Sequence, residues 1–97
     1  MDIFQVTLAK QLIRELKRFP IPRHIALSLQ EWIESVKVDG LHKTRKISGY
    51  HDEPVKGKQR QGQRSIRLNR SWRAFYRIDE KGVIHFIEIL EINKHEY

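Results

Sequence analysis

Three stretches in the second half of the chain decide the fold: QRSIRLN (residues 63–69), WRAFYRI (72–78) and VIHFIEILEI (83–92). In the first two, apolar and polar side chains alternate, which is typical of strands with one buried face. Asn69-Arg70-Ser71 is short enough for a hairpin loop, and Asp79-Glu80-Lys81-Gly82 forms a turn with a glycine where a positive φ is often needed. The pattern predicts an antiparallel meander.

The first half of the chain predicts a short strand and two helices that would cover this meander. Ile3 to Val6 alternates weakly and indicates the strand. Apolar residues at helical spacing mark the two helices: Leu8, Leu12, Ile13 and Leu16, then Ile25, Leu29, Trp32, Ile33 and Val36. Pro20 ends the first helix, and the second starts near Pro22 and ends near Gly40. We expect an α+β fold with a short N-terminal strand and a two-helix hairpin packed on one face of an antiparallel C-terminal meander sheet.

The segment from Leu41 to Gly62 lacks apolar periodicity and contains three glycines and one proline. It is predicted to be a loop. A structureless connection of about twenty residues is uncommon in a compact domain and is usually functional or disordered.

Length and composition restrict the class of protein. With 97 residues, the chain is expected to form one domain over residues 1–97. The sequence has no cysteine, which excludes disulfide scaffolds, thiol nucleophiles and cysteine-ligated metals. No run approaches 18 apolar residues, and the N-terminus lacks the pattern of a secretory signal. We therefore expect a soluble, unprocessed cytoplasmic protein without a membrane partner.

The positive charge is concentrated in one segment. The net charge of the chain is +7, but Lys43 to Arg77 contains eleven basic and only two acidic residues, and the rest of the chain has a net charge of −2. Such a concentration favours a polyanionic partner, either nucleic acid or an acidic protein.

Strand alternation assigns part of this charge to one surface. Arg67, Arg73 and Arg77 are predicted on the sheet face opposite the helices, together with Phe75. One guanidinium group can donate two parallel hydrogen bonds to the oxygens of a phosphate, so this face could bind a sugar-phosphate backbone. From the pattern alone, a merely solvated arginine face is equally compatible.

Several motifs occur in an order that resembles the RelE/YoeB/HigB superfamily of bacterial type II toxins. They are EPVKG (53–57), GQRSIRLN (62–69), WRAFY (72–76) and the terminal HEY (95–97). The resemblance spans essentially the whole chain. It implies a toxin that cuts mRNA as a metal-independent endoribonuclease, commonly in the decoding site of the ribosome, and that is silenced by a cognate antitoxin.

The resemblance also implies roles for individual residues in cleavage by the neighbouring 2′-hydroxyl, which requires a base, a cationic group and an acid. Glu53 is the implied general base, with Asp52 in reserve. Arg73 would bind the scissile phosphate and stabilise its developing charge. Arg67 and Lys56 would contact the same or an adjacent phosphate, and Arg77 lies on the same predicted face.

The C-terminus would complete the site. His95 is the implied general acid, because an unperturbed imidazole has a pKa of ~6.5 and can hold a proton near neutral pH. Tyr97 would stack on a base or orient the substrate. His51 lies near the predicted base and is a further RNA-binding or acid–base candidate. One departure is Ser65, which stands where RelE has a lysine, so a mechanism built from several lysines is not expected in the same form.

The implied partners are a cognate antitoxin, mRNA and the ribosome, and operator DNA bound by the toxin–antitoxin complex. No cofactor is expected, and a hydrolytic metal site is disfavoured because the five histidines have no compact ligand spacing. Two other hypotheses stay open: a non-catalytic RNA- or DNA-binding module that uses the same arginine face, and an interaction protein whose basic groove holds an acidic peptide.

Overall fold

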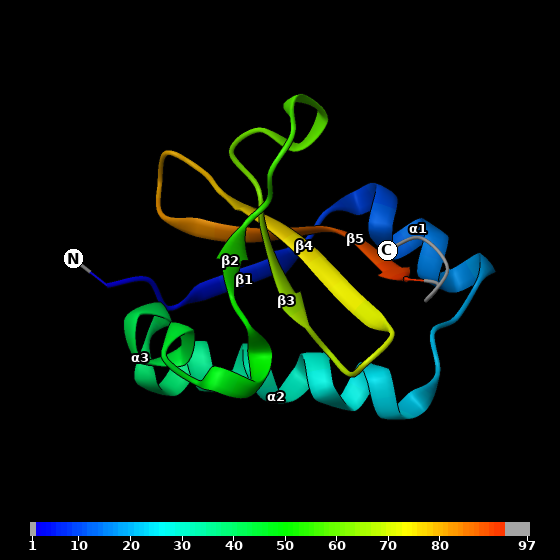
Figure 1. Ribbon diagram of the computed structural model, residues 1–97, viewed down its shortest axis with the longest axis horizontal. Helices are drawn as coiled ribbons and strands as arrows, with labels where there is room; N and C mark the ends of the chain where they lie inside the picture. Colours follow the sequence, from blue (N-terminus) through cyan, green and yellow to red (C-terminus); the bar gives the residue numbers. More distant parts are fainter. Residues whose placement is uncertain (1, 93–97) are drawn as a thin grey trace.

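The computed structural model, described here for residues 2–92, is an α+β fold built on a five-stranded sheet (Figure 1). The strands are β1 (Gln5–Leu8), β2 (Glu53–Pro54), β3 (Arg64–Arg67), β4 (Trp72–Ile78) and β5 (Val83–Glu91). Their order is β1-β5-β4-β3-β2. The predicted meander is confirmed, since β3, β4 and β5 pair antiparallel. The sheet as a whole is mixed, because β1 joins β5 in parallel.

Two helices follow β1 as expected: α1 (Lys10–Arg18) and α2 (Arg23–Asp39). Pro20 lacks an N–H and restricts Phe19, so α1 ends just before this pair. The first strand lies two residues further along the chain than predicted, because Gln5 to Leu8 are the residues that pair with β5. The helix after it accordingly begins at Lys10.

The predicted structureless loop from Leu41 to Gly62 is wrong. It contains α3 (Leu41–Arg45), two 3-10 turns, η1 (Ser48–Tyr50) and η2 (Lys58–Arg60), and the edge strand β2. These elements are too short to show a hydrophobic period. The edge strand β2 is held instead by pairing with β3, with Glu53 opposite Ser65 and Pro54 opposite Arg64.

The core lies between the helices and one face of the sheet (Figure 1). The stripe of Ile25, Leu29, Trp32 and Val36 on α2 is buried. The rings of Trp32, Tyr76 and Phe86 form an aromatic cluster with centroids 5.3–5.5 Å apart, which fixes α2 against β4 and β5. The opposite face of the sheet carries no helix in the part of the chain that the structure describes, and we call it the open face.

No helix within residues 2–92 combines the length and the hydrophobicity that crossing a lipid bilayer requires.

Candidate functional site

Four strands contribute one residue each to a row across the middle of the open face. Glu53 pairs with Ser65, Ser65 with Phe75, and Phe75 with Glu88. Because directly opposed residues project to the same side of a sheet, these side chains share the open face. The predicted base therefore lies in line with an aromatic ring and a second carboxylate.

Glu53 and Arg73 line the same hollow on this face. The hollow has a volume of about 410 Å³, and its wall includes Lys56, Ser65 and Phe75. The edge strand supplies Glu53 and the loop behind it supplies Lys56, while β4 supplies Arg73 and Phe75. The fold thus brings the predicted base, the predicted phosphate ligand and an additional lysine to one cavity.

The arginine row lies beside this hollow. Arg67 is directly opposite Arg73, and neither has a carboxylate within 4.0 Å among residues 2–92. Like charges placed opposite each other on a sheet repel, so the pair is suited to an anion that bridges both. Arg77 is exposed, opposite His85, on the far side of Phe75. The predicted shared face of the three arginines agrees with the strand register.

Asp52, the reserve candidate for the base, is not in the hollow. Its side chain is 0% exposed and accepts hydrogen bonds from the Tyr76 hydroxyl at 2.6 Å and from Arg64 Nε at 2.8 Å. Alternation explains the difference, since Asp52 points to the helix side and its neighbour Glu53 to the open side. Asp52 connects the edge strand to β3 and β4.

The pKa values of Tyr76 and Arg64, the two partners of Asp52, are both shifted by this environment. Burial of the phenol raises the pKa of Tyr76 well above its usual value, and the hydrogen bond to Asp52 adds to this effect. Partial burial lowers the pKa of Arg64, but the Asp52 carboxylate outweighs it, so the pKa of Arg64 is raised overall. Arg64 stays charged, and the phenol stays protonated through the physiological range.

The remaining predicted residues are distributed differently. His51 is exposed, has a left-handed φ of 46°, and lies two residues before Glu53, but it does not line the hollow. His95 and Tyr97 lie outside the described residues. Ile92, the last described residue, lines the hollow.

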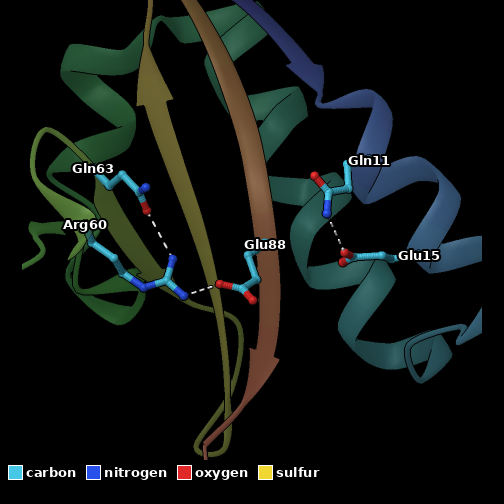
Figure 2. A network of polar contacts seen from close by, with 5 residues as sticks. All are labelled: Gln11, Glu15, Arg60, Gln63 and Glu88. Carbon is cyan, nitrogen blue, oxygen red and sulfur yellow. Dashed lines mark hydrogen bonds and ion pairs between the residues drawn. The ribbon is translucent and has the colours of Figure 1, made fainter.

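Sequence reasoning missed Arg60, which covers the ring of Phe75. The Arg60 guanidinium carbon lies 3.9 Å from the ring centroid, and its nitrogens donate to Gln63 at 3.1 Å and to Glu88 (Figure 2). Phe75 is consequently only 7% exposed, although it is on the open face.

A bulge in β5 explains why strand alternation does not predict the contact between Arg60 and Glu88. Phe75 pairs with Glu88 but Tyr76 pairs with Phe86, so Ile87 is an extra residue in β5. Strict alternation from His85 would place Glu88 on the helix side. In the structure the buried residues Phe86 and Ile89 are accordingly three apart instead of two.

No protein-family model and no curated protein matches the sequence. Solved structures do. The RelE–RelB complex from Pyrococcus horikoshii OT3 aligns with a TM-score of 0.64 at 15% identity, covering 97% of this chain and 99% of that chain. The YoeB–YefM complex from Staphylococcus aureus gives 0.63 at 20% identity, with coverages of 93% and 97%. YafQ from E. coli gives 0.63 at 11% identity, with coverages of 90% and 91%.

At these identities the alignments establish architecture, and they extend over nearly the full length of both partners in each comparison. The strand, helix hairpin and meander deduced from the sequence are part of that shared architecture. The chain has the fold of the RelE and YoeB toxins.

Proposed function

We propose that this protein is the toxin of a type II toxin–antitoxin pair and that it cleaves mRNA through attack of the neighbouring 2′-hydroxyl. One observation carries the proposal: Glu53 and Arg73 line one hollow next to the Arg67–Arg73 pair. Several proteins of this fold are described as toxins, including YoeB of S. aureus in a toxin–antitoxin complex and a protein from Helicobacter pylori.

The hollow supports an assignment of roles. The carboxylate of Glu53 accepts the proton of the attacking 2′-hydroxyl, which is worth about 10²–10⁴-fold in rate for a positioned base. Arg73 and Arg67 hold the scissile phosphate from adjacent strands and stabilise the charge that develops on it. Lys56 neutralises a further phosphate at the edge of the hollow. All of these roles use side chains, so the proposed reaction needs no metal ion.

His95 remains our proposed general acid for the departing 5′-oxygen, and Tyr97 our proposed contact for the substrate. Support comes from chain connectivity. His95 follows Ile92 by three residues, and three extended residues span at most about 11 Å. Because Ile92 lines the hollow, this chain length is sufficient for His95 to reach it, and Tyr97 is two residues further along the chain. Arg77 and His51 are proposed to contact RNA outside the hollow.

The proposed partners are mRNA, the ribosome, a cognate antitoxin and operator DNA. The mRNA is presented by the ribosome in the bacterial cytoplasm, and a cognate antitoxin blocks cleavage by covering the open face. The toxin–antitoxin complex is proposed to bind its operator DNA.

The decisive experiment maps the 5′ ends of cellular mRNA after induction of the wild type, Arg73→Ala, Glu53→Gln and Arg70→Ala. Arg70→Ala is the matched control, because it removes the same charge from the exposed β3–β4 loop. We expect new ends in register with codons for the wild type and the control. Loss of one transition-state contact lowers the rate by about 10²–10³-fold, so Arg73→Ala should produce almost none.

Mechanism is tested in vitro on ribosomes programmed with mRNA, in the Mg²⁺ that keeps the ribosome assembled. Cleavage should leave a 2′,3′-cyclic phosphate and stop when a 2′-deoxynucleotide replaces the nucleotide that carries the attacking hydroxyl. Identical end profiles for the wild type and Arg73→Ala, with both proteins folded, would contradict the nuclease proposal. The open face would then be a non-catalytic site for RNA or DNA.

A further inference from the structure

We propose that the guanidinium group of Arg60 is a stacking platform for one unpaired nucleobase of the RNA. This proposal deepens the function proposed above and rests on it for the identity of the ligand. The platform is distinct from the phosphate-binding arginines, and nucleobases stack on guanidinium planes as well as on aromatic rings.

Contacts on three sides fix the plane of this guanidinium. Its inner face lies over the Phe75 ring, with the central carbon 3.9 Å from the centroid. Its nitrogens Nη1 and Nη2 donate to Gln63 and Glu88, respectively, which approach the group from different directions (Figure 2). Hydrogen bonds to a guanidinium lie in its plane, so these contacts restrict both its tilt and its rotation.

Part of the Arg60 side chain remains accessible to a ligand. The side chain of Arg60 is 27% exposed. With its inner face over Phe75 and two of its nitrogens bonded to Gln63 and Glu88, the face of the plane turned away from Phe75 is the surface that we propose a base contacts. A flat, oriented surface on an otherwise flexible side chain lowers the entropy cost of stacking, because its rotamer is already restricted before RNA binds.

Arg60 differs from the arginines proposed to bind phosphate in having a carboxylate partner. Glu88 neutralises Arg60, whereas Arg67 and Arg73 have no carboxylate partner among residues 2–92. A phosphate would have to compete with Glu88 for Arg60, but a neutral base would not. The paired charge therefore favours a base over a phosphate at this position.

Location links the platform to the hollow. Phe75, which supports Arg60, also lines the cavity with Glu53 and Arg73. Arg73 lies two residues before Phe75 on the same strand and the same face. A nucleotide whose phosphate is held by Arg73 can thus place its own or the adjacent base on Arg60.

The test separates base stacking from phosphate binding and from cleavage. The probe is a short single-stranded RNA with every 2′-hydroxyl methylated, so that attack is blocked, together with versions in which one base is deleted at each position in turn. Binding of the full-length protein is measured by fluorescence anisotropy. The variants are Arg60→Lys, which keeps the charge but loses the plane, and Arg70→Lys as the control.

For the wild type, deletion of one particular base should weaken binding by about 5–150-fold, the range for one stacked base. In Arg60→Lys this penalty should fall below about 2-fold, while RNA lacking that base binds both proteins equally. Arg70→Lys should behave as the wild type.

Three results would overturn the proposal: no binding of intact RNA by the folded wild type, an unchanged penalty in Arg60→Lys, or equal weakening of intact and base-deleted RNA. The last would make Arg60 a structural contact of the η2 turn. If the penalty depends on Arg60 but the wild type cuts no RNA in the end-mapping experiment, the platform stands and the nuclease proposal fails.

Discussion

Removal of the Asp52 carboxylate should be among the most destabilising single changes on the sheet. The side chains of Asp52 and Tyr76 are fully buried, and Asp52 accepts hydrogen bonds from Tyr76 and Arg64. Asp52→Ala leaves the Tyr76 hydroxyl without its acceptor and the Arg64 cation without its counter-ion. Breaking a buried pair in this way costs about 3–5 kcal/mol. Because Arg64 is 24% exposed and can reach water, we expect the lower end of that range, about 3 kcal/mol.

Two further variants, Tyr76→Phe and the double variant of Asp52 and Tyr76, show how much of this cost comes from the hydrogen bond between the two residues. Tyr76→Phe removes one hydrogen bond to a charged group and should cost about 1.5–3 kcal/mol. Once Asp52 is alanine, the hydroxyl has no acceptor to lose, so the double variant should be less destabilised than the sum of the two single variants. Urea unfolding followed by circular dichroism measures all three free energies of unfolding. At 4–8 °C per kcal/mol for a domain of this size, Asp52→Ala should lower Tm by about 12–24 °C.

A loss below about 1 kcal/mol for Asp52→Ala, or strict additivity in the double variant, would refute this reasoning. Either result would mean that water or another acceptor replaces the contacts that the structure shows.

Two smaller predictions concern the turns. Asp79 accepts hydrogen bonds from His85 and from the backbone of Val83 and Lys81, which lowers its pKa to about 2. The ionised Asp79 carboxylate therefore contributes to the free energy of unfolding above pH 3.8, and this contribution is lost as the pH falls from 3.8 towards 2. Asp79→Asn should therefore make the free energy of unfolding, measured by urea titration, less dependent on pH between 3.8 and 2. Gly40→Ala should cost more than about 1 kcal/mol, because φ is +90° and the new Cβ would overlap the Asp2 carboxylate and force it to move. Gly49→Ala, with nothing within 4 Å of the new Cβ, should change the unfolding midpoint little.

The order of elements could be predicted because each long element has its own hydrophobic period. β4 was predicted with its observed ends, and the stripe from Ile25 to Val36 on α2 is buried as expected. The elements that periodicity cannot reveal are those between Leu41 and Gly62, where each is five residues or shorter. The edge strand β2 exists only because β3 pairs with it, and that pairing is a tertiary contact.

The residues of the candidate site also include some that the sequence could predict and some that it could not. Alternation was sufficient to place Arg67, Arg73 and Phe75 on one face, because β3 and β4 pair regularly along their shared length. Glu88 required knowledge of the bulge at Ile87, and Arg60 required the course of the η2 turn. Residues on regular strands could thus be predicted from the sequence, whereas those placed by a bulge or a turn could not.

The two acids of the basic segment illustrate how adjacent residues acquire different functions. Asp52 and Glu53 are chemically similar, but successive residues of an extended chain point to opposite faces. Asp52 is buried against Tyr76 and Arg64, and it holds in place a strand of only two residues. Glu53 is left exposed and lines the hollow together with Arg73. A carboxylate on such a short edge strand would have little positional restraint from backbone pairing alone, so the buried acid supplies the rigidity that the proposed catalytic acid–base group needs.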